Sequence, residues 1–504
     1  MKRLEELADL VPGARIAGDK CTEITSIERD SRRAAEGALF VCINGVHVDA
    51  HSFIPNAARA GARAVLTERD KVAVPPGISV LHVPDLQEAL DLIVPYFYDY
   101  PARAMRVIGI TGTNGKTTTS YLVRAMLRHA GRRVGLIGTI QIMMEDDVFS
   151  TANTTPDVIV MQQLLAEMRT RGMDAVVMEV SSHALDQGRV AGIEFDTAVF
   201  TNLTQDHLDY HKTMENYARA KARLFDLVSE PGVAEVMNLI GDVEGKTAIL
   251  NADDAAAKTM RAHTHCPLIT YGVDMPADLT ARKIRLGQDG MELTIAYAGA
   301  ELPAVQTGIT GLFNVYNVLA AAGAALAEQV PASDITAALA AFSGVPGRFE
   351  LVRAGQDFSV IVDYAHTPDG MKNVLRTARA VTTGRIITVF GCGGDRDRTK
   401  RPIMGRIAAE LGDVIVLTSD NPRTEDPAAI LDEVEAGVLP AIGGKPYEKL
   451  VDRRTAIFHA VQTARVGDTV VILGKGHETY QILKDGTIHF DDRETAAEAI
   501  RSRQ

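Results

Sequence analysis

Residues 109–119 read Gly-Ile-Thr-Gly-Thr-Asn-Gly-Lys-Thr-Thr-Thr, between an apolar run and an amphipathic one. This order predicts a strand, a glycine-rich loop and a helix. Such a loop directs backbone N–H groups and a helix N-terminus at phosphate oxygens. Lys116 would add a positive charge on the transferred phosphate, and Thr117 a hydroxyl for Mg²⁺. The strict P-loop has glycine where this chain has Ile110, and Gly112 instead gives a G-x-x-G-K-[ST] variant.

Length and composition favour a multidomain globular protein of the cytoplasm. A chain of 504 residues is too long for one core, so two to four domains are expected. The net charge of −12, without a dense basic cluster, argues against nucleic acid as a partner. No run approaches the length of a membrane span, and the N-terminus lacks the apolar core of a signal peptide. The four cysteines form no C-x-x-C pair, which favours reduced thiols over zinc or disulfides.

Three blocks can be distinguished along the chain, and each mixes strand-like with helix-like runs. We expect domains at 1–103, 104–345 and 346–504, because Asp99-Tyr100-Pro101 and Gly344-Val-Pro-Gly347 have the composition of linkers. Short apolar runs that alternate with helical periodicity predict mostly parallel sheets, and in the third block a doubly wound, Rossmann-like α/β fold. The clearest buried strands are expected at 175–180, 197–203, 386–390, 414–417 and 470–473.

Polar residues follow the apolar strands of the central block. Glu179 ends one strand, and His207 lies shortly after another. Because ligands of open α/β sheets bind at the carboxyl ends of strands, both side chains are candidates for a Mg²⁺ that Thr117 also holds. Carboxylate and hydroxyl oxygens suit Mg²⁺, whereas histidine is a less usual ligand. The alternatives are an ordinary strand-end carboxylate and a structural histidine.

Three strands of the third block run into polar loops that contain glycine or proline, at 391–397, 419–423 and 474–478. If these strands are parallel, the loops meet at one edge of one sheet. They would bring two arginines and several carboxylates together, which matches a ligand that carries both ammonium and carboxylate groups. The glycines favour close approach of a ligand. The alternative is a set of solvated polar turns.

Three further residues have ordinary interpretations when each is considered alone. Lys221 lies in a helix-like stretch and has the pattern of a solvated helix lysine. Asn314 and Asn317 lie near the expected start of a helix, where an N-cap is the simplest role.

Taken together, the motifs resemble those of the Mur ligases, the ATP-dependent amino-acid-adding enzymes of peptidoglycan precursor synthesis. The resemblance covers essentially the whole chain. Its markers are Gly112-Thr-Asn-Gly-Lys-Thr-Thr118, Glu179-Val-Ser-Ser-His183, Thr201-Asn-Leu203, Asp206-His-Leu-Asp209, Phe313-Asn314 with Asn317, Gly347-Arg348 and Asp363-Tyr-Ala-His366.

Within the family, the chain is similar to the members that add meso-2,6-diaminopimelate to UDP-N-acetylmuramoyl-L-alanyl-D-glutamate (UDP-MurNAc-L-Ala-D-Glu). Asp30-Ser31-Arg32 with Gly37-Ala-Leu-Phe40 resembles their UDP-binding domain, and Asn153-Thr-Thr-Pro156 resembles their muramoyl-dipeptide loop. Asp420-Asn-Pro-Arg423 resembles their amino-acid signature, at which lysine-adding relatives differ and lack the arginine.

The resemblance implies a role for each marker. ATP would be held by Gly112, Thr113, Asn114, Gly115, Lys116, Thr117, Thr118, Asn317, Arg348, Asp363 and His366. Mg²⁺ would be held by Thr117, Glu179, His207 and Lys221, the last as a carbamate, and Lys116 would act with the last three in catalysis. The UDP-MurNAc-dipeptide would contact Ser31, Val46, His47, Asn153, Thr154, Thr155, Ser181, Gln187 and Arg189. Diaminopimelate would contact Arg396, Asp420, Asn421, Pro422, Arg423, Gly474 and Glu478.

The implied reaction is formation of an acyl phosphate from ATP, followed by attack of the amine. A cytoplasmic monomer that neither binds nucleic acid nor inserts into membranes is expected. Three alternatives stay open: a folylpolyglutamate synthase, a kinase that uses the same loop, and a non-catalytic nucleotide-binding regulator. The UDP-type first block and the 420–423 loop count against the first of these.

Overall fold

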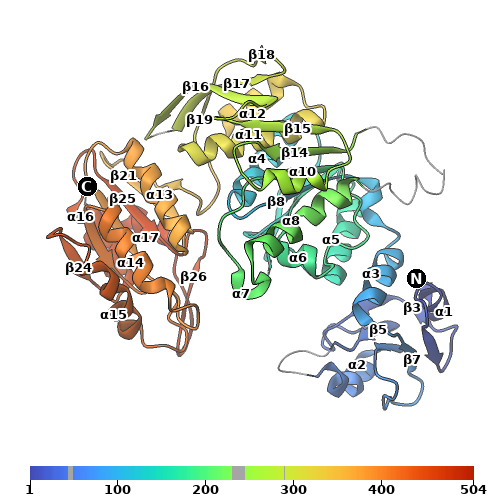
Figure 1. Ribbon diagram of the computed structural model, residues 1–504. Coiled ribbons are helices and arrows are strands. Elements are labelled where there is room, and N and C mark those ends of the chain that lie inside the picture. The colour runs from blue at the N-terminus through green and yellow to red at the C-terminus, as the bar shows by residue number, and fades with distance from the viewer. Residues whose placement is uncertain (44–48, 152, 230–244, 289, 504) are drawn as a thin grey trace.

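The computed structural model describes all residues except 44–48, 152, 230–244, 289 and 504. Figure 1 shows three α/β parts in chain order, with the N-terminal and C-terminal parts each adjoining the central one. Within the described part of the chain, no helix is both long and apolar enough to cross a membrane.

The N-terminal part is built on a five-stranded sheet in the order β2-β7-β6-β5-β4. Strands β4 to β7 are parallel, and β2 joins antiparallel to β7. The strands are β2 (Arg15–Ala17), β4 (Ser26–Glu28), β5 (Ala38–Val41), β6 (Ala64–Thr67) and β7 (Ser79–His82), with a small ladder of β1 (Lys2–Arg3) and β3 (Glu23–Ile24). The helices are α1 (Leu4–Ala8), α2 (Ile54–Ala60) and α3 (Leu86–Phe97).

The central part has a twelve-stranded sheet in the order β11-β10-β9-β12-β8-β13-β14-β15-β16-β17-β18, with β19 on β17. From β9 to β16 the neighbours are parallel. These strands are β8 (Arg106–Thr111), β9 (Val134–Ile137), β12 (Ala175–Glu179), β13 (Thr197–Phe200), β14 (Thr247–Asn251), β15 (Leu268–Gly272) and β16 (Leu279–Gly287). The others are β10 (Ile142–Met144), β11 (Asp147–Phe149), β17 (Gly290–Tyr297), β18 (Ala300–Glu301) and β19 (Val305–Thr307).

Helices cover both faces of the central sheet, which explains the near-continuous apolar strands. In β12, Val177 belongs to one core cluster, whereas Val176 and Met178 belong to the other. The first cluster includes side chains of α4 and α11, and the second includes side chains of α5 and α8. The helices are α4 (Lys116–His129), α5 (Val158–Thr170), α6 (Ser182–Asp186), α7 (Leu208–His211), α8 (Met214–Ser229), α10 (Ala257–Ala262), α11 (Leu312–Ala327) and α12 (Ala332–Ala341).

The C-terminal part has a six-stranded sheet in the order β20-β21-β25-β22-β23-β24, parallel from β21 to β24. Its strands are β20 (Glu350–Leu351), β21 (Ser359–Asp363), β22 (Ile386–Phe390), β23 (Val414–Leu417), β24 (Tyr447–Lys449) and β25 (Thr469–Leu473), and a hairpin of β26 (Tyr480–Leu483) and β27 (Gly486–His489) follows. Its helices are α13 (Pro368–Val381), α14 (Lys400–Leu411), α15 (Pro427–Val438), α16 (Arg453–Thr463) and α17 (Asp492–Arg501). The predicted parallel arrangement of the third block is thereby confirmed.

One local expectation is wrong. Helix α11 begins at Leu312 with Gly311 as its N-cap, so Asn314 and Asn317 lie inside the helix and do not cap it. Both amides are buried and bond to each other, Asn317 Nδ2 donating to Asn314 Oδ1 at 3.0 Å. Gly311 occupies the N-cap position because glycine readily adopts the φ of +101° found there. The helix therefore begins at Leu312, before both asparagines.

Candidate active site

The glycine loop between β8 and α4 has the predicted strand–loop–helix setting, and its two glycines are required sterically. Gly112 has φ +147°, and an added Cβ would lie 1.9 Å from Thr201 Oγ1. Gly115, the N-cap of α4, has φ +85°, and its Cβ would lie 2.3 Å from Asn317 Oδ1. The helix N-terminus carries no side-chain cap, so its amides remain available for an anion.

Polar contacts fix the rest of the loop against the segment after β13. The backbone N–H of Thr113 donates to Asn202 O at 2.8 Å, and that of Asn114 donates to Asn202 Oδ1 at 2.9 Å. Thr118 is buried in the first turn of α4. The backbone is therefore held in shape without a ligand, as a preorganised phosphate site requires.

Two lysines converge on one carbonyl of this loop. Lys116 Nζ donates to Gly112 O at 2.9 Å and to Thr113 O at 2.8 Å, and Lys221 Nζ donates to Gly112 O at 2.7 Å. Lys221 is 1% exposed and lies over the ring of Tyr217, so it is not the solvated helix lysine that its pattern suggested. Burial lowers the pKa of Lys116. Burial lowers the pKa of Lys221 well below its usual range, and the charge of Lys116 lowers it further.

Glu179 and Thr117 meet beside the loop, as expected of a strand-end cation site. Thr117 Oγ1 donates to Glu179 Oε2 at 3.0 Å, and the carboxylate is 1% exposed. Thr139, which sequence reasoning missed, donates to Glu179 through its hydroxyl at 2.9 Å and through its N–H at 2.8 Å. Its position just after β9 is the same strand-end signal that identified Glu179.

Of the four predicted metal ligands, Thr117 and Glu179 are hydrogen-bonded to each other, Lys221 donates to Gly112 O, and His207 lies beside Asp206. His207 is half exposed, lies in α-left conformation with φ +53°, and packs edge-on against the ring of His183. Among the described residues, no group of three or more His, Cys, Asp and Glu side chains is poised to hold a metal. Thr117 and Glu179 still fit Mg²⁺, because a hydroxyl and a carboxylate completed by phosphate oxygens and water are the donors it prefers.

Arg348 brings the C-terminal part to the phosphate loop. Its Nη2 lies 3.4 Å from Thr117 Oγ1, and its guanidinium lies over the ring of Tyr364. Asp363 is turned toward its own backbone, because it accepts from the N–H groups of Phe349 and Ala365, both at 2.7 Å. Burial raises the pKa of Asp363, with Arg348 opposing this.

Two other residues that were predicted to bind the nucleotide are Asn317, in the central part, and His366, in the C-terminal part. Asn317 Oδ1 accepts from Thr119 Oγ1 at 3.5 Å, which places the amide next to Gly115. His366 is exposed, and its Nδ1 lies 2.9 Å from Tyr364 O. The structure thus brings Arg348 and Asn317 to the loop, whereas Asp363 and His366 shape the turn after β21.

Most of the predicted dipeptide residues are linked around the end of β12. Thr155 Oγ1 donates to Glu179 O at 2.8 Å and lies 3.4 Å from Ser181 Oγ. Arg189 donates to Thr155 O at 3.0 Å and to Gln187 Oε1 at 2.7 Å.

The remaining residues predicted for this substrate are more scattered. Thr154 Oγ1 lies 3.1 Å from Thr139 Oγ1, and Asn153 is exposed. Ser31 lies in a turn of the N-terminal part. Val46 and His47 lie outside the described residues.

The loops after β22, β23 and β25 meet at one edge of the C-terminal sheet, as expected. Asn421 Nδ2 donates to Glu478 Oε2 at 2.9 Å, and a Cβ on Gly474 would lie 2.4 Å from Asp420 Oδ2. Arg423, with φ +52°, donates to Gly394 O at 2.8 Å.

Two arginines flank the loop after β22. A Cβ on Gly393 would lie 2.9 Å from Arg423 Nη1 and 3.8 Å from Arg396 Cγ. The carbonyl of Pro422 packs on Gly394, where an added Cβ would lie 1.9 Å from it. Guanidinium, amide and carboxylate groups therefore face one region, a set suited to a ligand with both charges.

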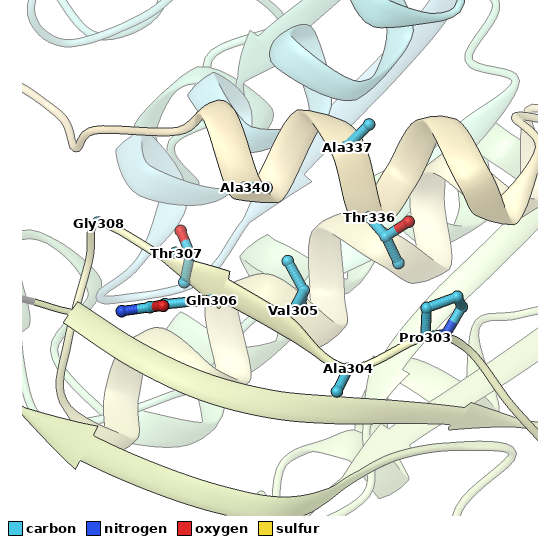
Figure 2. A pocket seen from close by; sticks show the side chains of 9 residues that line it. All are labelled: Pro303, Ala304, Val305, Gln306, Thr307, Gly308, Thr336, Ala337 and Ala340. Atoms are coloured by element: carbon cyan, nitrogen blue, oxygen red, sulfur yellow. The ribbon is translucent and has the colours of Figure 1, made fainter.

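A shallow pocket elsewhere on the central part lies between β19 and α12 (Figure 2). It is lined by Pro303, Ala304, Val305, Gln306, Thr307, Gly308, Thr336, Ala337 and Ala340. The lining includes no charged side chain and no predicted site residue, so this pocket lacks the groups that would bind phosphate or an amino acid.

The phosphate loop and the charged loops of a second sheet define a multidomain α/β protein of nucleotide-dependent ligase type. Three family descriptions match the chain: "Mur ligase family, catalytic domain" over residues 23–103, "Mur ligase middle domain" over 110–325 and "Mur ligase, glutamate ligase domain" over 347–476. The chain belongs to the Mur ligase family.

Relatives cover the whole chain. It is 48% identical to the UDP-N-acetylmuramoyl-L-alanyl-D-glutamate–2,6-diaminopimelate ligase of Bacillus cereus over 95% of each chain. It is 45% identical to the enzyme of the same name from Geobacillus thermodenitrificans over 100% of each. A solved structure of that name has 31% identity and a TM-score of 0.70 over 100% of this chain and 99% of its own.

A Mycobacterium tuberculosis folylpolyglutamate synthase, solved with ADP and AMPPCP, shares the fold. It has 18% identity and a TM-score of 0.63 over 81% of this chain and 93% of its own. At that identity the likeness extends to the fold alone. The full-length relatives favour the Mur ligase interpretation over this alternative.

Proposed function

We propose that this chain is an ATP-dependent ligase that adds 2,6-diaminopimelate to the D-glutamate of UDP-MurNAc-L-Ala-D-Glu. The observation that carries the proposal is the contact between Arg348 and Thr117, which joins a phosphate loop to a second sheet bearing paired arginines and carboxylates. Full-length relatives at 45–48% identity carry the name of this activity.

The proposed reaction has two steps. The γ-carboxylate of D-glutamate attacks the γ-phosphate of ATP, forming an acyl phosphate and releasing ADP. The amine of diaminopimelate then attacks the acyl carbon and loses a proton, forming the amide, and phosphate leaves with the bonding electrons. Lys116 and the N-terminal amides of α4 stabilise negative charge on the phosphates during the first step.

Mg²⁺ would be held by Thr117 and Glu179, and when bound it neutralises charge on the phosphates. We include His207 in this proposal because it follows β13 on the same edge of the sheet. Glu179 is kept in orientation by the two hydrogen bonds from Thr139. Arg348 would reach the nucleotide by leaving Thr117, since a guanidinium binds phosphate more strongly than a neutral hydroxyl.

Lys221 is proposed to be carbamylated. Its amine would add to CO₂, forming an N–C bond and releasing a proton, which needs the neutral amine that its lowered pKa provides. The resulting anion would offset the charge of Lys116, which shares the Gly112 carbonyl with it. It would also supply an additional oxygen ligand for Mg²⁺.

The remaining assignments divide the substrates among the three parts. The uridine nucleotide would bind near Ser31, Val46 and His47, and the dipeptide along Asn153–Thr155, Ser181, Gln187 and Arg189. Diaminopimelate would bind Arg396, Asp420–Arg423, Gly474 and Glu478. We place the domain boundaries at 103/104 and 345/346 and propose a cytoplasmic monomer, consistent with four free cysteines.

Product analysis tests the function. The enzyme is incubated with ATP, Mg²⁺, UDP-MurNAc-L-Ala-D-Glu and one amino acid from a panel that includes diaminopimelate and lysine. We expect equal amounts of ADP, phosphate and amide product, with diaminopimelate preferred. A stable phosphorylated product that forms when no amino acid is added would indicate a kinase. A failure to consume ATP would indicate a regulator.

A further inference from the structure

Lys475 lies directly after Gly474 at the end of β25, and its side chain is fully buried. Its Nζ lies 3.1 Å from Asn421 Oδ1 and 3.0 Å from Glu478 Oε2. Asn421 Nδ2 donates to that same Glu478 oxygen at 2.9 Å. The three side chains form a closed triangle that joins the loop after β23 to the loop after β25.

The sheet does not join these two loops directly. Strand β22 lies between β23 and β25, so no ladder hydrogen bonds connect the two strands directly. Arg453 links their ends, donating to Ser419 O at 3.3 Å and to Leu473 O at 3.0 Å. Lys475 provides a second connection between the two loops, because it bonds to the side chains of Asn421 and Glu478, which face the proposed ligand.

The hydrogen bonds of the triangle fix the orientation of both partners. Asn421 Oδ1 accepts from Lys475 and from the N–H of Ile482 at 3.0 Å, so its NH₂ group is directed at Glu478. Glu478 Oε2 accepts from both neighbours, whereas no described residue donates to Oε1. The carboxylate thus keeps one oxygen for a ligand while its charge is balanced by a buried cation.

We propose that Lys475 is a positioning residue for the amino-acid substrate. Its ammonium group holds Asn421 and Glu478 together, so that the free oxygen of Glu478 accepts a hydrogen bond from an ammonium group of the incoming diamino acid. This role rests on the function proposed above and adds a residue to it that does not itself touch the substrate.

The test is the KM of each of the three substrates in the variant Lys475→Met. The methionine keeps most of the volume but donates no hydrogen bond. Loss of two charge-assisted bonds should raise the KM for diaminopimelate about ten- to a hundredfold. The KM values for ATP and UDP-MurNAc-L-Ala-D-Glu should stay within about twofold, because Lys475 contacts neither proposed site.

Arg385→Met is the matched control. Arg385 precedes β22 and forms an ion pair at 2.6 Å with Asp468, which precedes β25. The substitution therefore removes a cation beside the same two strands, but at their opposite ends. We expect this control to lower thermal stability without changing the KM for diaminopimelate. If Lys475→Met does not fold, Lys475→Gln retains one donor and should give an intermediate increase in that KM.

Three results would overturn the proposal. The first is a folded variant whose KM for diaminopimelate is unchanged. The second is an equal change in all three KM values, and the third is the same change in the Arg385 control; either of these two would show a merely structural role. Failure of the wild-type enzyme to use diaminopimelate would instead refute the proposed function, so the two failures are distinguishable.

Discussion

Lys221 shows how far the environment of one residue can depart from its sequence pattern. Its helix carries charged neighbours, yet Lys221 lies on the buried face with Tyr217 and Phe225. Lys221 is buried because α8 packs against β8, a tertiary contact that the local sequence does not reveal. The family resemblance identified the residue, whereas its local sequence favoured a solvated side chain.

Lys221→Ala should leave the enzyme nearly inactive, because the proposed carbamate would be lost. Short carboxylic acids should restore part of the activity by supplying the missing anion. The measurement is phosphate release with and without such acids. Mass evidence for unmodified Lys221 in a fully active, metal-loaded enzyme would refute the carbamate. Removal of CO₂ should lower the activity, and renewed addition of CO₂ should restore it. Since the carbamate forms from the neutral amine, this recovery should be faster at higher pH.

Arg423→Ala should reduce kcat/KM for diaminopimelate by roughly tenfold to a few hundredfold, because a charged hydrogen bond contributes about 1.5–3 kcal/mol. Diaminopimelate carries a distal carboxylate that lysine lacks, and a guanidinium binds it through two parallel hydrogen bonds. Lysine should therefore be a poor substrate for the wild-type enzyme, and kcat/KM for lysine should change little in the variant. An equal loss for both amino acids would show that Arg423 does not determine specificity.

At the scale of elements, the sequence predicted the strand–loop–helix unit around Gly112 and the parallel strands of the third block. Their short apolar runs end at polar or glycine-containing loops, which makes the strands recognisable. The start of α11 was missed because two asparagines suggested a cap, whereas Asn317 lies inside the helix next to Gly115 and Asn314 bonds to Asn317. Thr139 was missed because β9 carries no motif beyond the position of its end.

Gly115→Ala should impair both the fold and nucleotide binding. A non-glycine residue at φ +85° costs about 1–2 kcal/mol, and the new Cβ would also collide with Asn317. We expect a lower midpoint of thermal unfolding and a raised KM for ATP. Gly131→Ala is the control, because Gly131 has φ +82° and no atom within 4 Å of an added Cβ. The account is wrong if both variants bind ATP as the wild type does.

At the scale of the whole molecule, the proposed function requires that groups from all three parts meet at one reaction centre. The sequence predicted the three parts, but the contact between Arg348 and Thr117 joins residues 231 positions apart. Local pattern carries no information on such a contact. The rings of Phe313 and Phe349, 5.7 Å apart, pack at the same junction.

Arg348→Lys should raise the KM for ATP by about ten- to a hundredfold, because lysine lacks the planar fork that both stacks on Tyr364 and reaches the loop. Thermal stability should change little. Arg379→Lys, which alters a surface ion pair with Asp413, is the control and should leave the KM for ATP unchanged. An unchanged KM in Arg348→Lys would remove this contact from the proposed nucleotide site.

Transfer of ¹⁸O tests the central claim, that ATP activates the substrate carboxylate before the amide forms. UDP-MurNAc-L-Ala-D-Glu labelled with ¹⁸O in the γ-carboxylate is converted with ATP and diaminopimelate, and the released phosphate is analysed by mass. The acyl-phosphate route predicts one labelled oxygen in phosphate for each amide formed, with the other oxygen retained in the product. Unlabelled phosphate accompanying normal product formation would contradict the account.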